Sequence, residues 1–258
     1  MDTPELLALL SIASLPLGLR LIARYLPRLR PVSAAYAIMG YNVRVTLLAE
    51  VFLVLAGIVA RAVWHIPWAL TALQLLLANL LLLLPIRTLF WEPKPHYTKE
   101  PNLNLFWFGL LAAGLAYANF VFCFVRNNLD LGYVSTRNPL YFKATSTALL
   151  TLVLCQSLNL LLSRSAHHAQ FFTRHLWSNR QLLRGFGAIT IVLTLILYMP
   201  GVNNFFGTGP LDATDWFWVV IAGGIYLGCR VLQRHTRKHS RHAVLQLHRQ
   251  VSSSKTSS

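Results

Sequence analysis

Residues 66–101, IPWALTALQLLLANLLLLLPIRTLFWEPKPHYTKEP, decide the fold of this chain. The stretch holds about 20 almost uncharged residues, which is enough for a helix to cross a hydrocarbon core of about 30 Å. The uncommon polar side chains inside this run are Gln74 and Asn79, and the run ends at Pro85 and Arg87. The sequence here therefore predicts a membrane-spanning helix followed by a polar, proline-rich loop.

The composition of the whole chain is that of a membrane protein. Of its 258 residues, 55% are hydrophobic and 12% are charged, and the mean hydropathy is +0.51. A soluble domain carries about a quarter charged residues. We therefore expect an integral, multi-pass protein of the plasma or an inner membrane, with the lipid bilayer as its first partner. Three cysteines lie in apolar segments without CxxC spacing, so we expect buried thiols and no metal site: Cys123, Cys155 and Cys229.

Seven apolar stretches have the length of a membrane helix, so we predict an all-α, polytopic transmembrane bundle. The expected spans are at about residues 4–26, 33–64, 68–90, 105–125, 142–162, 183–200 and 215–233. We divide the chain into an N-terminal span with a basic segment (1–34), a six-helix domain (35–233) and a basic, serine-rich tail (234–258). We expect the tail to form a short surface helix and a disordered end.

The basic residues predict the orientation of the bundle, because cytoplasmic loops carry an excess of Lys and Arg. With the N-terminus outside and the C-terminus inside, nearly all of the 23 Lys and Arg residues are cytoplasmic; the exceptions are Arg61, Arg126, Arg137 and Lys143. Topology and lipid head groups account for the net charge of +15. RNA binding by the tail is the minor alternative, so we expect no nucleic-acid partner.

Several stretches resemble P-type cation-transporting ATPases. PWALTALQLLLANL (67–80) resembles the sixth membrane helix of these pumps, and ATSTALLTLVLCQSLNLLLSR (144–164) resembles the eighth. Ser178 and Asn179 stand where the ninth helix opens, and YMPGVNNFFGTGPLDATDW (198–216) resembles the outer loop and the start of the tenth. These motifs agree with the family in order and in spacing.

The resemblance covers about residues 42–235 and implies membrane helices five to ten of such a pump. A remnant of the fourth helix precedes them, because Pro16-Leu17-Gly18-Leu19 resembles the family's Pro-Glu-Gly-Leu turn. We therefore name Pro16 and Gly18 as a candidate helix-unwinding motif. The alternative is an ordinary proline kink in a membrane helix.

The domains that hydrolyse ATP in the family have no counterpart in this sequence. P-type pumps insert several hundred residues between the fourth and fifth helices, whereas only about 20 residues separate Leu19 from Asn42 here. The sequence contains no Asp-Lys-Thr-Gly phosphorylation motif and no GxxxxGK[ST] phosphate-binding loop. We therefore predict no catalytic residues, no cofactor and no enzyme activity of this chain alone.

The resemblance also implies a degraded ion site. Cation transport needs several carboxylates or carbonyl groups that converge in the membrane. Leu17 stands where the family has a fourth-helix glutamate, and Leu82 and Leu83 stand where the calcium-pump pattern has Thr-Asp. Asn79 matches the family asparagine. We predict no bound metal ion.

Glu50 is the one acid that lies away from the ends of a predicted span, and it is near the position of the family's fifth-helix glutamate. An intramembrane carboxylate marks a functional site by default, because its burial is costly. The alternative is a protonated side chain, or one paired with Arg44 near the cytoplasmic end. Four other intramembrane polar residues are candidates for an ion pathway or for interhelical hydrogen bonds: Gln74, Asn79, Gln156 and Asn159.

Three functions follow from these observations. In the first, the chain is a non-catalytic structural or regulatory partner of another membrane protein. In the second, it is the membrane subunit of a split cation pump, and a separate cytoplasmic ATPase is its partner. In the third, it is a passive ion permease whose pathway is lined by Glu50, Asn79 and Gln156. We rank the first highest, because it agrees with the lost ligands.

Overall fold

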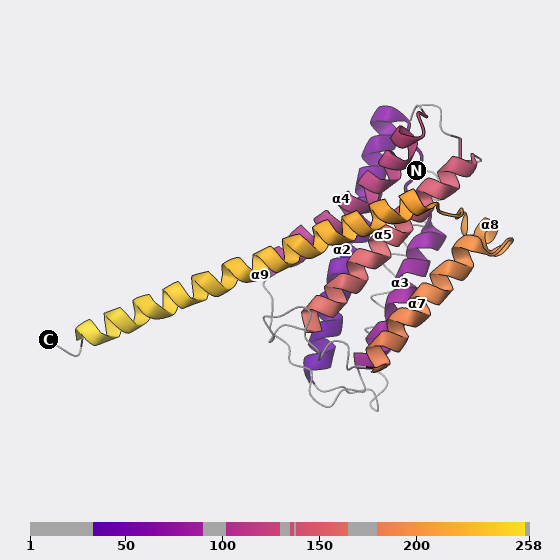
Figure 1. Ribbon diagram of the computed structural model, residues 1–258. Helices are drawn as coiled ribbons and strands as arrows, with labels where there is room; N and C mark the ends of the chain where they lie inside the picture. Colours follow the sequence, from indigo (N-terminus) through magenta and orange to yellow (C-terminus); the bar gives the residue numbers. More distant parts are fainter. Residues whose placement is uncertain (1–32, 90–101, 130–134, 137, 165–179, 256–258) are drawn as a thin grey trace. The chain divides into compact units, whose positions relative to one another are not determined.

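The computed structural model of this protein describes residues 33–89, 102–129, 135–136, 138–164 and 180–255. All regular structure in these ranges is helical, which confirms the predicted all-α fold. The helices are α2 (Ser33–Trp64), α3 (Ala72–Leu89), α4 (Asn102–Arg126), α5 (Pro139–Arg164), α7 (Arg180–Tyr198), α8 (Val202–Phe206) and α9 (Ala213–Lys255) (Figure 1). The predicted first span, with Pro16 and Gly18, lies outside the described residues.

Six of the expected spans coincide with helices. Four helices contain a stretch that is long and apolar enough to cross a membrane: Arg44–Trp64, Phe106–Arg126, Pro139–Leu162 and Ala213–Gln233. Within the described residues, α3 and α7 contribute shorter apolar stretches, Ala72–Leu81 and Leu183–Tyr198. Apolar runs of this length form helices in lipid because every backbone polar group must be hydrogen-bonded within the segment.

Among the four helices with a membrane-spanning stretch, α5 is the most enclosed. Within the protein, 83% of its apolar stretch is buried, compared with 44% or less in the other three spanning stretches. α4 packs against α5 and α2, while α3 packs against α7 and α5. The polar residues of α5 are therefore held inside protein and not against lipid.

Small residues let α2 and α4 approach closely. Ala49 on α2 and Ala112 and Ala116 on α4 are all buried. A Cβ atom added at Gly109 of α4 would lie 2.7 Å from Leu48 Cβ and 3.2 Å from the backbone nitrogen of Ala49. Close approach of this kind supplies packing energy between membrane helices, where no hydrophobic driving force acts between them.

We expect Gly109→Ala to lower the free energy of unfolding by about 1–3 kcal/mol, because the added methyl group overlaps α2. Gly114→Ala on the same helix is the matched control, since no atom lies within 4 Å of its added Cβ. Thermal unfolding of the two purified variants in the same detergent compares them. Equal melting temperatures for both variants would contradict the close packing of α2 on α4.

Helix α8 is a single short helix in the loop between α7 and α9, and the sequence did not predict it. Gly201 precedes it with φ of 88°, and Gly207 follows it with φ of 62°. Positive φ values are strained for residues with a Cβ atom, which is why glycine stands at both ends. The two glycines thus fix the turn that returns the chain from α7 to α9.

The C-terminal tail differs from the prediction. α9 continues past the last span to Lys255, so the short surface helix expected in the tail is wrong, and residues 256–258 of the expected disordered end lie outside the described residues. No Gly or Pro follows Gly228 before Lys255, and the segment is rich in good helix formers, so nothing in the sequence ends the helix. Among the cysteines, Cys123 and Cys155 are buried as predicted, whereas Cys229 on α9 is exposed, and the prediction is wrong there.

Candidate functional site

A buried contact between α2 and α3 joins two of the predicted site residues. Asn79 Nδ2 donates to Glu50 Oε1 at 2.7 Å and to the carbonyl oxygen of Leu75 at 3.0 Å. Glu50 is 1% exposed. Its second oxygen, Oε2, has no hydrogen-bond partner in the described part of the chain. Two polar residues that lie 29 positions apart in the sequence therefore form one buried site.

The alternative in which Arg44 pairs with Glu50 is wrong. Arg44 is exposed, and no ion pair joins these two residues. Six residues along an α-helix correspond to about 240° of rotation, so the two side chains leave α2 on different faces. Asn79, and not Arg44, is the hydrogen-bond partner of Glu50.

Gln156 and Asn159 lie on α5, the most enclosed of the four spanning helices. Gln156 is 3% exposed and Asn159 is 1% exposed. Neither Oε1 nor Nε2 of Gln156 has a hydrogen-bond partner within the described ranges. Gln156 is therefore not hydrogen-bonded to Glu50 or Asn79. Glu50 and Gln156 are buried, and Asn79 is half-buried.

Gln74 belongs to a different place, at the start of α3. Its Oε1 accepts from the Thr71 backbone N–H at 3.0 Å, while Thr71 Oγ1 accepts from the Gln74 backbone N–H at 3.3 Å. This reciprocal pair is a capping box, which satisfies two of the free N–H groups at a helix start. Gln74 Nε2 also donates to the carbonyl oxygens of Phe206 and Gly207, both at 2.9 Å. Gln74 therefore fastens α3 to the end of α8.

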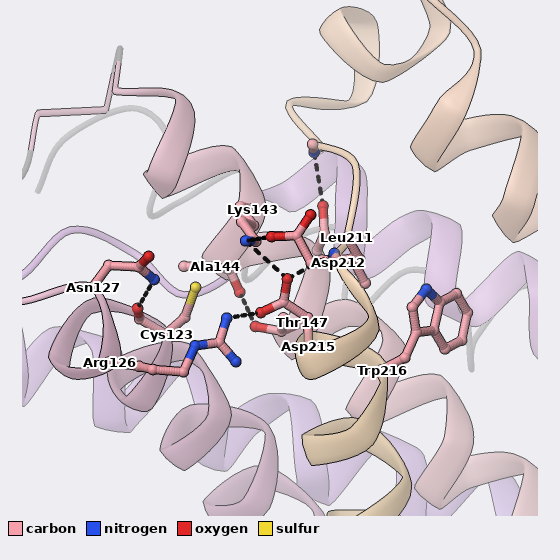
Figure 2. Close-up of polar contacts among 12 residues, drawn as sticks. Cys123, Arg126, Asn127, Lys143, Ala144, Thr147, Leu211, Asp212, Asp215 and Trp216 are labelled. Atoms are coloured by element: carbon pink, nitrogen blue, oxygen red, sulfur yellow. Dashed lines mark hydrogen bonds and ion pairs between the residues drawn. The ribbon is translucent and has the colours of Figure 1, made fainter.

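A second polar cluster joins α4, α5 and the start of α9 (Figure 2). Asp215 forms ion pairs with Arg126 at the end of α4 and with Lys143 on α5, the latter at 3.0 Å. Its Oδ2 also accepts from the Asp212 backbone N–H at 2.9 Å. The Asp215 side chain is 1% exposed, whereas that of Asp212, which pairs with Lys143, is 72% exposed. Asp215 is thus the buried centre of a structural ion-pair cluster.

Sequence reasoning missed this cluster as a unit. A signal was present, because the orientation predicted from the basic residues places all four charged residues on the outer side. Acidic and basic residues at the ends of adjacent helices on the same side of a membrane are expected to form ion pairs with one another. What the sequence lacked was the packing of α4, α5 and α9, which decides which acid meets which base.

Neither cluster supplies the ligand set of a divalent cation. Ca²⁺ takes 6–8 oxygen ligands, and Mg²⁺ takes an octahedral set. Asn79 turns its amide nitrogen, not its oxygen, toward Glu50, and in the other cluster Arg126 and Lys143 neutralise Asp215. No group of three or more His, Cys, Asp and Glu side chains comes together in the described ranges. The geometry supports polar contacts between helices.

A family model described as "Cation transporting ATPase, C-terminus" matches residues 67–234. The chain belongs to this family. The predicted resemblance is therefore confirmed, and the match covers Gln74, Asn79, Gln156 and Asn159, while Glu50 precedes it. The matched part of the family is the C-terminal transmembrane region of P-type ATPases, so this protein contains a membrane domain related to cation transporters. No curated protein sequence matches the chain.

Proposed function

We propose that this protein is a non-catalytic member of the cation ATPase C-terminal family that acts as a structural or regulatory partner of another membrane protein. The observation that carries the proposal is the Glu50–Asn79 contact. Asn79 Nδ2 is shared between Glu50 and the Leu75 carbonyl. The family's asparagine position is thus used for a hydrogen bond between two helices.

Other buried polar groups support the same function, because they hold helices and loops together. Thr145 Oγ1 on α5 donates to the carbonyl oxygen of Gly207 at 3.0 Å, and Ser146 Oγ accepts from the Gly209 N–H at 2.8 Å. Asn119 Nδ2 on α4 donates to Thr151 Oγ1 on α5 at 2.7 Å. Hydrogen bonds between membrane helices contribute about 0.6–2 kcal/mol each, so this set stabilises a fixed frame.

A second candidate, a passive cation pathway, is favoured by the atoms that remain without partners. Glu50 Oε2 and both amide atoms of Gln156 are buried and have no hydrogen bond to any described residue. A buried polar group without a partner is costly, and water or a passing ion would satisfy it. A passive pathway requires cation flux without ATP, whereas a split pump requires ATP for cation flux.

Flux measurements test the proposal directly. We expect liposomes that contain the purified protein to pass Ca²⁺, Na⁺ and K⁺ no faster than protein-free liposomes, because Glu50 is engaged by the Asn79 amide and no cluster of ligand side chains for a cation occurs in the described ranges. Glu50→Gln serves as the site variant, and Asp212→Asn as its matched control, since Asp212 is an exposed carboxylate. Flux that is lost in Glu50→Gln and kept in Asp212→Asn would establish a permease and overturn the proposal.

Purification from native membranes in a mild detergent, followed by mass spectrometry, tests the partner role. We expect a second integral membrane protein at a fixed molar ratio. A soluble protein with ATPase activity at a fixed ratio would instead establish a split pump. In that case ATP-dependent flux of the reconstituted pair becomes the decisive measurement.

A further inference from the structure

Four cations follow the last membrane span within residues 234–241, and no acidic residue accompanies them. They are Arg234, Arg237, Lys238 and Arg241, which we call the tail cluster. No Asp or Glu occurs after Asp215. The tail cluster belongs to α9, which is helical up to Lys255. Its positions are spaced by three, four and seven residues, which places them along one face of the helix.

The tail cluster lies close to the end of the last span because only a few residues separate the two along α9. An α-helix rises about 1.5 Å per residue, so Arg234, Arg237 and Lys238 lie within about 8 Å of Gln233, the last residue of the apolar stretch. Arg241 lies about 12 Å away. The screening length at physiological salt is about 8 Å, so three of the four charges lie within reach of a charged membrane surface.

We propose that the tail cluster binds anionic lipid head groups at the membrane surface from which α9 emerges. Charge complementarity is the main reason, because the tail contains cations and no acids. Lys and Arg next to an anionic surface contribute about 1 kcal/mol each, which corresponds to about fivefold in affinity per cation. Arginine also forms paired hydrogen bonds with phosphate oxygens.

The composition of the tail favours lipid over single-stranded RNA. RNA-binding segments combine positive charge with aromatic side chains on which bases stack. No Phe, Tyr or Trp follows Tyr226 in this chain. Apolar aliphatic residues occur there instead, including Val244, Leu245 and Leu247, and these side chains offer no ring on which a base could stack.

Ser240 lies inside the tail cluster, next to Arg241 and three residues after Arg237. An acidic group at this position would reduce the net positive charge of the cluster without removing any cation. Polybasic membrane-binding segments are released by phosphorylation in this way. Ser240→Glu is therefore a test of the electrostatic mechanism, and Ser240→Gln is its neutral control.

The experiment uses the full chain in nanodiscs of phosphatidylcholine with 30 mol% phosphatidylserine. A fluorophore is attached to Ala243→Cys in a Cys229→Ser background. Cys123 and Cys155 are buried, so the label attaches to the introduced cysteine. A head-group quencher on phosphatidylserine is compared with the same quencher on phosphatidylcholine. We expect the quencher on phosphatidylserine to quench the fluorophore more strongly than the same quencher on phosphatidylcholine. This difference should become smaller at 1 M salt. Arg237→Gln with Lys238→Gln should reduce the preference by about 25-fold, as two cations are removed.

The matched control removes two cations that lie farther along the same helix, Arg249→Gln with Lys255→Gln. These residues lie about 24 Å and 33 Å from Gln233, so we expect little change in the preference. An equal loss in both double variants, or equal quenching by the two lipids in the parent protein, would overturn the proposal. A parent protein that shows no preference for the anionic lipid but binds a short single-stranded RNA would assign the tail cluster to nucleic acid and would also overturn the proposal.

Discussion

Replacing Asp215 with asparagine should lower the free energy of unfolding by about 3–5 kcal/mol. Asp215 is buried and holds Arg126, Lys143 and the Asp212 backbone N–H at once. Removal of one partner from a buried ion pair is this costly because the remaining charges stay desolvated and lose their counter-ion. Lys143 would keep its ion pair with Asp212, while Arg126 would lose its pairing with Asp215. Chemical unfolding of the purified protein in detergent measures the loss.

Asp212→Asn is the matched control for this prediction. It removes the same charge from a carboxylate that is 72% exposed and that pairs with Lys143. Exposed ion pairs contribute about 0–1 kcal/mol and are weakened by salt. We therefore expect a small loss that disappears in high salt, in contrast to a large and nearly salt-independent loss for Asp215→Asn. A similar, salt-sensitive loss for both variants would show that Asp215 acts as a surface charge.

The positions of the helices were predictable because one physical rule dominates in a membrane. A run of about 20 apolar residues must be helical, and charged or proline-rich segments must lie outside the hydrocarbon. The expected span at 33–64 coincides with α2, Ser33–Trp64, and that at 105–125 lies within α4, Asn102–Arg126. The length and polarity of each apolar run do not determine which helices pack against one another.

The partners of the polar residues were not predictable for that reason. One alternative pairs Glu50 with Arg44, six residues earlier on the same helix, whereas the structure pairs Glu50 with Asn79 on α3. The correct pairing depends on the rotation of α2 and α3 about their axes. The sequence constrains that rotation weakly, because apolar residues surround both helices and their hydrophobic faces are poorly defined.

Gln74 shows a local signal that was present and was not used. Thr71 and Gln74 have the T-x-x-Q spacing of a capping box, which marks the start of a helix. The span expected at about 68–90 begins before Gln74, so the sequence pattern places this residue among the intramembrane candidates. The structure begins α3 at Ala72, so Gln74 lies in the first turn.

This position of Gln74 predicts the second large effect. Gln74→Leu should lower the free energy of unfolding by about 2–4 kcal/mol. The loss combines about 1 kcal/mol for the helix cap with about 1–3 kcal/mol for a partly buried carbonyl left without its donor. That carbonyl is the one of Phe206, because the Gly207 carbonyl keeps its hydrogen bond from Thr145 Oγ1. Thermal unfolding in detergent measures the total.

Two further variants separate the cap from the link to α8. Thr71→Ala removes the hydroxyl that accepts from the Gln74 N–H and leaves Nε2 in place, so we expect a loss of about 1 kcal/mol. Gln74→Glu keeps an acceptor for the Thr71 N–H but removes the donor to Phe206 and Gly207. We expect this variant to be as unstable as Gln74→Leu, because a carboxylate oxygen would face two carbonyl oxygens. If Gln74→Glu unfolds like Thr71→Ala, then α8 is not held by this side chain and the cap is its main role.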